Sequence, residues 1–116
     1  METVEEERFA HLVEEAVEAL PVWVRRTLDN VEIFIDDEPP GGQPLLGLYE
    51  GIPLVARGNH YSGALPDRIT LFAGPIWREA HGDETRLQAI VGHTVAHEIA
   101  HHFGISDDRL REIDAY

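Results

Sequence analysis

The hydrophobic positions of the first twenty residues recur every three or four places, the spacing of one face of a helix. That face consists of Phe9, Leu12, Val13, Ala16, Val17 and Leu20. Thr3 and Glu6 fit the capping box that starts a helix, and Pro21 marks its end. The pattern predicts a helix over roughly residues 4–20. Pro21 can also open a short further helical turn within 21–29.

The middle of the chain changes to the patterns that are typical of strands. Residues 31–36, VEIFID, alternate between apolar and mainly acidic positions. Residues 51–57, GIPLVAR, and 68–74, RITLFAG, are β-rich runs separated by a turn-like segment. The segment 37–47, DEPPGGQPLLG, is rich in Pro and Gly and is expected to be a loop. We therefore predict three strands.

The last third of the chain predicts two helices. Asp83 can cap a long helix that runs to about Phe103, where Gly104 ends it. Ser106 or Asp107 can cap a last short helix. This order lacks a regular βαβ alternation and predicts an α+β fold. We expect one domain over residues 1–116, with a small, mostly antiparallel sheet packed on the long helix and the N-terminal helix.

Composition and charge narrow the possible functions. The 116 residues include no cysteine, which excludes disulfides, thiolate metal sites and cysteine nucleophiles. The formal net charge of -13 disfavours binding to nucleic acid, because such a surface repels phosphate. No apolar run approaches the ~20 residues of a membrane span, so no membrane association is expected. The acidic N-terminus has no secretory signal pattern, and a cytoplasmic protein is expected.

The segment 91–108, VGHTVAHEIAHHFGISDD, contains four of the seven histidines. His97 and His101 are four residues apart and therefore share one face of the predicted helix. Glu98 lies about 100° further round, too far to join them easily as a ligand but near enough to reach a metal-bound water. This is the geometry of the HExxH motif, which combines two metal ligands with one general base.

A catalytic zinc normally takes three protein ligands and leaves one position to water. Gly104 allows the chain to turn sharply and return past the metal. Asp107 and its neighbour Asp108 are the candidates for the third ligand. We predict that His97, His101 and Asp107 hold Zn²⁺ and that Glu98 is the catalytic base.

The pattern His97-Glu98-x-x-His101-x-x-Gly104-x-x-Asp107 resembles the zinc-binding consensus of the zincin metallopeptidases, in the form HExxHxxGxxD. It is similar to the metzincin motif with Asp as the third ligand, and most similar to the minimal zincin-like family of small bacterial proteins. The shared run is HEIAHHFGISDDRL, and LDNVEI and PDRITLF also match. The resemblance implies a small sheet over the active-site helix, with its edge strand bordering the cleft. Metzincins have a methionine turn beneath the zinc. Here the only methionine is Met1, so another part, such as the last helix, must form the floor.

The function favoured by these residues is zinc-dependent hydrolysis of a peptide or protein substrate. The exposed edge of RITLF or IPLVA could hold an extended peptide by strand addition. One alternative is a non-catalytic metal-binding or interaction module, in which a side chain such as His93 fills the fourth metal position. Another is a metal-dependent RNA hydrolase, a class whose pattern has His at the third ligand position and does not need Glu98. The acidic surface also disfavours it.

Other polar residues have simpler expected roles. His93 is expected at the rim of the site, and a ligand role remains the alternative. His102 points about 140° away from His97 and is expected to pack against a loop. His60 and Tyr61 are expected in a plain loop, with oxyanion stabilisation as the alternative. Arg109 is expected in a surface ion pair, and it could instead anchor a carboxylate of the site.

Overall fold

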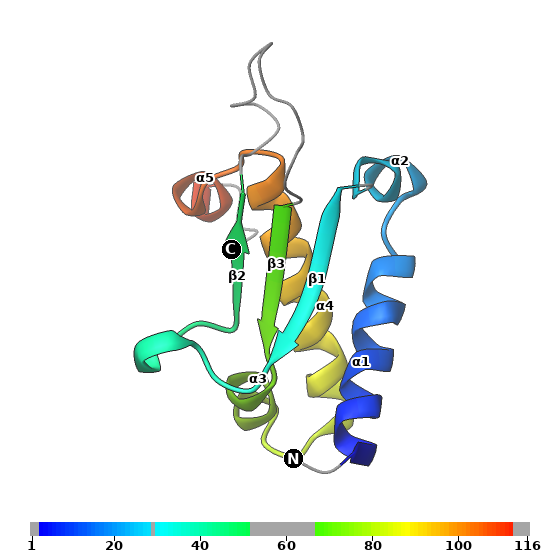
Figure 1. Cartoon of the computed structure of the whole chain (residues 1–116), viewed down its shortest axis with the longest axis vertical. Helices are drawn as coiled ribbons and strands as arrows, with labels where there is room; N and C mark the ends of the chain where they lie inside the picture. The colour runs from blue at the N-terminus through cyan, green and yellow to red at the C-terminus, as the bar shows by residue number, and fades with distance from the viewer. Residues whose placement is uncertain (1–2, 29, 52–66, 113–116) are drawn as a thin grey trace.

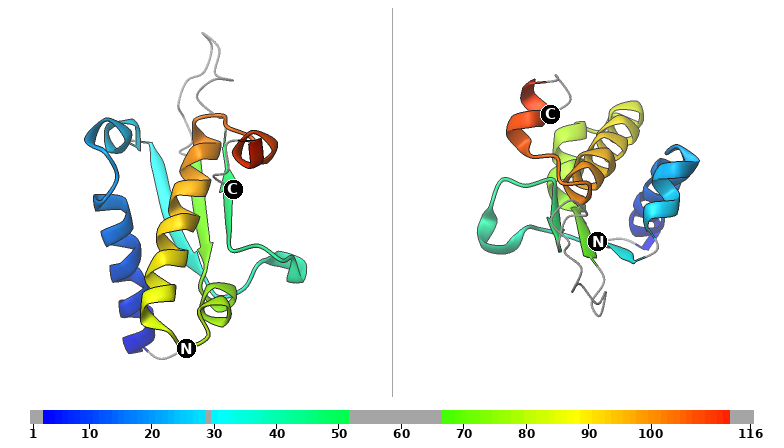
Figure 2. Two further views of the ribbon diagram at one scale, coloured as in Figure 1. Left: turned by 180° about the vertical axis from the view of Figure 1, so that it is seen from behind. Right: turned by 90° about the horizontal axis from the view of Figure 1, so that it is seen from above.

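One face of a three-stranded sheet is covered by two helices that lie side by side (Figures 1 and 2). The computed structural model describes residues 3–28, 30–51 and 67–112. The elements are α1 (Thr3–Glu18), α2 (Val22–Arg25), η1 (Arg26–Leu28), β1 (Val31–Asp36), η2 (Pro40–Gly42), β2 (Gly47–Glu50), β3 (Asp67–Phe72), α3 (Ala73–Ala80), α4 (Glu84–His102) and α5 (Asp107–Glu112). The predicted α+β class is confirmed. The predicted strand over 51–57 lies almost entirely outside the described residues.

The sheet has the order β1-β3-β2. β1 runs parallel to β3, with Ile33 opposite Ile69, and β2 runs antiparallel to β3, with Tyr49 opposite Ile69. The sheet is therefore mixed rather than mostly antiparallel. After β1 the chain passes to the far side of β3 to form β2, and then returns into the middle of the sheet in the direction of β1. The run RITLF is thus the central strand, and the expectation that its edge could receive a peptide is wrong.

The core lies between this sheet and the helices α1 and α4. Ile69 and Leu71 of β3 are fully buried on the helix side, whereas Arg68 on the opposite face lies 4.0 Å from the centre of the Phe34 ring. The helices contribute apolar side chains at helical spacing: Phe9, Leu12 and Val13 from α1, and Leu87, Val91, Val95 and Ile99 from α4. Figure 2 shows α1 and α4 in front of the strands when the molecule is seen from behind. The apolar face of α4 is thereby fixed against the sheet.

Both ends of α4 are defined by local hydrogen bonds. At its start, Asp83 Oδ1 accepts hydrogen bonds from the backbone N–H groups of Thr85 and Arg86, at 2.9 and 3.1 Å. At its end, Gly104 has a φ of 86° and its N–H bonds the carbonyl of His101, while the Ile105 N–H bonds that of Ala100. This Schellman motif turns the chain back toward α4. The predicted cap and stop of the helix are confirmed.

Two elements differ from the sequence expectation. β2 forms within and just after the segment 37–47, which the sequence predicts to be a loop, and the helix α3, which the sequence pattern does not predict, includes Ala73 and Gly74 from the end of the predicted third strand. None of the described helices combines the length and hydrophobicity needed to cross a bilayer.

Candidate metal centre

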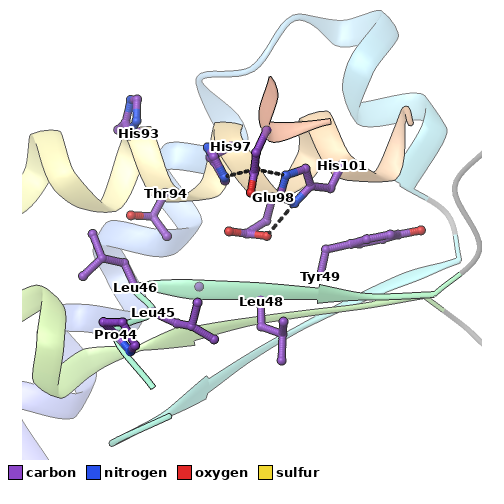
Figure 3. Close-up of a pocket in the computed structure, with 12 residues that line it drawn as sticks. Pro44, Leu45, Leu46, Leu48, Tyr49, His93, Thr94, His97, Glu98 and His101 are labelled. Carbon is purple, nitrogen blue, oxygen red and sulfur yellow. Dashed lines mark hydrogen bonds and ion pairs between the residues drawn. The ribbon is translucent and has the colours of Figure 1, made fainter. Parts of the chain in front are cut away.

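A cleft of about 620 Å³ lies between α4 and the edge strand β2 (Figure 3). Its α4 side is polar and carries His93, Thr94, His97, Glu98 and His101, and α5 adds Asp107. Its opposite side is mainly apolar and consists of Pro44, Leu45, Leu46, Gly47, Leu48 and Tyr49. The cleft therefore brings more than two turns of α4 against the edge strand β2.

His97 and His101 lie on the cleft side of α4, as their four-residue spacing predicts. Their ring centroids are 4.7 Å apart, with the ring planes at 73°. One nitrogen of each ring and one carboxylate oxygen of Glu98 all lie within 4.8 Å of one another. This cluster could hold a divalent metal ion.

Asp107, the first residue of α5, returns to the two histidines after the turn at Gly104. Its Oδ1 atom lies 2.7 Å from His101 Nε2 and 3.2 Å from His97 Nε2. Two ligand atoms bound at about 2.1 Å to one tetrahedral ion would be roughly 3.4 Å apart. The separation between His97 and Asp107 is close to this value, whereas the 2.7 Å separation between His101 and Asp107 is that of a hydrogen bond and would have to widen by about 0.7 Å around an ion. The structure places Asp107 here, whereas Asp108 is exposed.

Glu98 lies beside this cluster and is almost completely buried, with 5% of its surface exposed. Its Oε1 atom is 3.1 Å from His101 Nδ1, and its carboxylate also accepts a hydrogen bond from the backbone N–H of Tyr49. Burial is the largest influence on this group and raises the pKa of Glu98 above its ordinary value, although His101 opposes the shift. A carboxylate with a raised pKa accepts a proton more readily, as a general base requires.

Comparison with known families shows to which family this chain belongs. Residues 28–116 match the model of the zincin-like metallopeptidase family. This chain belongs to that family. It is also similar to a solved structure described as a conserved hypothetical protein from Thermus thermophilus, with a TM-score of 0.60 and 31% sequence identity over 85% of this chain and 94% of that chain. Comparison with curated proteins gave no match.

His97 of this zincin-like chain is suited to metal binding at neutral pH. Burial, followed by the neighbouring His101, lowers the pKa of His97, whereas Asp107 raises it. The lowered pKa keeps the ring neutral near pH 7. A neutral imidazole has the nitrogen lone pair that a metal requires, so proton competition is reduced.

Gly47 allows β2 to lie directly on the zincin-like helix α4. A Cβ atom at this position would be 2.9 Å from Thr94 Cγ2 and 3.1 Å from Glu98 Cγ. Any larger residue must therefore move the strand, Thr94 or Glu98. Sequence reasoning did not select Gly47, because nothing in a Pro- and Gly-rich segment distinguishes this glycine from its neighbours.

The remaining candidates are placed as follows. His93 is exposed at the cleft, 6.3 Å from His97 between ring centroids, and outside the donor cluster. Within the described residues, the ring of His102 is buried against Asp67 at the start of β3. Arg109 is exposed, and its backbone N–H donates to Ser106 Oγ. His60 and Tyr61 lie outside the described residues.

Proposed function

We propose that this chain is a zinc-dependent metallopeptidase that cleaves peptide bonds in peptide or protein substrates. One observation carries the proposal: the Nε2 atoms of His97 and His101 converge on Asp107 Oδ1 in the cleft that also holds Glu98. Two imidazoles, one carboxylate and a separate buried carboxylate form the donor set that zinc hydrolases use. Membership of the zincin-like family supports the same chemistry.

His97, His101 and Asp107 are the residues that would hold the ion. When bound in such a site, Zn²⁺ lowers the pKa of its water toward ~7 and polarises the carbonyl under attack. Glu98 accepts the proton from the attacking water and then delivers it to the leaving amine. Its burial and its raised pKa support this role, since both favour proton uptake from the water.

Among the described strands, β2 lies at an edge of the sheet, and this edge is the proposed binding place for an extended substrate. The Phe72 N–H donates to the Leu46 carbonyl at 2.9 Å, so Leu46 and Phe72 form a hydrogen-bonded pair. Hydrogen-bonded pairs alternate along an antiparallel ladder, and the backbone groups of Gly47 and Tyr49 therefore point away from β3. A peptide can pair with such an edge through the backbone groups of Gly47, whereas the Tyr49 N–H already donates to Glu98. Apolar side chains such as Leu45 and Leu46 would then lie beside the substrate.

The metal is tested first. Elemental analysis after zinc-supplemented purification is expected to give about one zinc per chain, and His97→Ala and Asp107→Ala are expected to lose it. Asp108→Asn is the matched control, because it changes the exposed neighbouring carboxylate and should keep the zinc. Loss of zinc in the Asp108 variant with retention in the Asp107 variant would overturn the proposed ligand set.

The reaction is tested with Glu98→Gln and a library of quenched fluorescent peptides. This variant is expected to retain zinc and to lose hydrolysis by a factor of at least about 10². Equal rates for the variant and the parent would exclude Glu98 as the base. A parent protein that binds zinc but cleaves no peptide or protein would instead be a metal-binding module.

A further inference from the structure

Three side chains from three different elements form a buried polar network beside the metal centre. Asp67 begins β3, His102 ends α4, and both are 1% exposed. Asp67 Oδ2 lies 2.8 Å from His102 Nδ1 and accepts a second hydrogen bond from the Tyr49 hydroxyl at 2.6 Å. Because a carboxylate accepts, the proton between Asp67 and His102 lies on Nδ1.

Stability alone does not explain this network. Burying a carboxylate costs several kcal/mol before its partners compensate, and apolar side chains of similar volume are often at least as stable. Within the part of the chain that the structure describes, the buried Nε2 atom of His102 has no hydrogen-bond partner. A buried polar network of this kind therefore contributes little net stability compared with apolar packing.

The network holds one particular residue of the edge strand. The Tyr49 side chain reaches Asp67, and its ring lies edge-on to His102 with the centroids 5.9 Å apart. The backbone N–H of the same residue faces the cleft and donates to the Glu98 carboxylate. Tyr49 is thus fixed at its ring end to the C-terminal end of α4 and at its amide to the proposed base.

Asp67 also lies against the end of β2. A Cβ atom added to Gly51, one residue beyond the strand, would be only 2.4 Å from Asp67 Oδ1. The carboxylate therefore meets this end of the chain at two points, the Tyr49 hydroxyl within β2 and Gly51 just after it. It connects this end of the edge strand to the last turn of the helix that carries His97 and His101.

We propose that Tyr49, Asp67 and His102 are positioning residues that fix the edge strand β2 relative to α4, and thereby the position of the Glu98 carboxylate. The expected effect on catalysis rests on the proposed peptidase function. The expected effect on structure, a restrained backbone amide at Tyr49, does not depend on any reaction. The proposed ligands are His97, His101 and Asp107, so zinc binding is expected to depend on them far more than on this network.

The test uses the full-length chain with Tyr49→Phe, which removes only the hydroxyl, and Asp67→Asn. Hydrogen exchange of the residue 49 amide, followed by NMR, is expected to become about tenfold faster in both variants. For peptide hydrolysis, kcat is expected to fall about tenfold with KM changed less than about threefold, because a misplaced base affects the transition state more than binding. Zinc affinity is expected to stay within about threefold of the parent value.

Thr27→Val is the matched control, because it also removes one hydroxyl hydrogen bond, from Thr27 Oγ1 to the Val24 carbonyl, away from the cleft. It is expected to leave residue 49 exchange and kcat unchanged. Parent-like exchange and kcat in Tyr49→Phe would overturn the proposal, as would equal changes in Thr27→Val. If the parent hydrolyses no peptide, the proposed function fails, while the exchange comparison still decides the positioning role. Tyr49→Phe alone suffices if Asp67→Asn does not fold.

Discussion

Glu98 shows at the residue scale how a buried site balances charge against stability. Burial raises its pKa above the ordinary 4.5 in the folded protein. At a pH between 4.5 and the raised pKa of the folded protein, the Glu98 carboxyl is protonated in the native state and ionised in the unfolded chain. The contribution of Glu98 to stability is therefore fully present below 4.5 and is lost as the pH rises through the folded pKa.

Glu98→Gln removes this charge and should consequently stabilise the metal-free protein. With a chelator present, the melting temperature of the variant is expected to exceed that of the parent at pH 7, and the difference should shrink toward about pH 4. Thermal unfolding across this pH range measures the effect. Glu14→Gln, on the exposed side of α1, is the control and should show no such pH-dependent gain. A gain that is larger at acid pH would contradict the argument.

The two halves of the site differ in how far the sequence predicts them. His97, Glu98 and His101 share one helix, so their relative positions follow from 3.6 residues per turn. Asp107 requires only the short turn at Gly104. Residues of the positioning network are different, because Tyr49 and Asp67 are 18 positions apart and Asp67 and His102 are 35 apart. The local periodicity of the sequence gives no information about contacts between residues that are so far apart along the chain.

At the scale of elements, β2 is a four-residue strand whose position depends on the absence of a side chain. Gly47→Ala places a Cβ atom 2.9 Å from Thr94 Cγ2 and 3.1 Å from Glu98 Cγ, so the strand or these two side chains must move. The variant is expected to fold but to lose at least about tenfold in kcat/KM for peptide hydrolysis, because the base is displaced.

A second substitution tests that explanation. Thr94→Ser removes Cγ2 and keeps the hydroxyl that bonds the Ile90 carbonyl at 2.7 Å. Combined with Gly47→Ala, it should restore much of the lost activity, whereas Thr94→Ser alone should behave like the parent. Steady-state kinetics on all three variants gives the answer. Additive losses in the double variant would rule out a steric cause.

The elements themselves were predictable where the pattern is local. The period of α1 and the period and cap of α4 are local features of consecutive residues, and both helices form where these patterns predict them. β2 escaped prediction because its residues follow a Pro- and Gly-rich segment, and their extended conformation is stabilised by pairing with β3. The parallel pairing of β1 and β3 likewise depends on the path of the whole chain. Such pairings are set by tertiary structure rather than by propensity.

At the scale of the whole molecule, α1 completes the core, although the family match begins at residue 28 and does not include this helix. Phe9 is fully buried against the core of α4 and the sheet. Phe9→Ala is expected to lower the free energy of unfolding by about 3–5 kcal/mol, a large part of the total for a domain of this size. Urea unfolding measures the loss. A change below about 1 kcal/mol would show that α1 contributes little.

Metal binding should be visible in the stability of the entire chain, since the proposed ligands lie on α4 and α5 and meet only when the turn between them is folded. An ion that binds the folded state alone stabilises it by about 2.7 kcal/mol at roughly 100 times its dissociation constant. For a domain of this length, this corresponds to a rise in melting temperature on the order of 10 °C. Differential scanning calorimetry with zinc and with a chelator measures the difference. Asp108→Asn should retain the rise and Asp107→Ala should lose most of it. An equal rise in both variants would mean that the ion binds elsewhere.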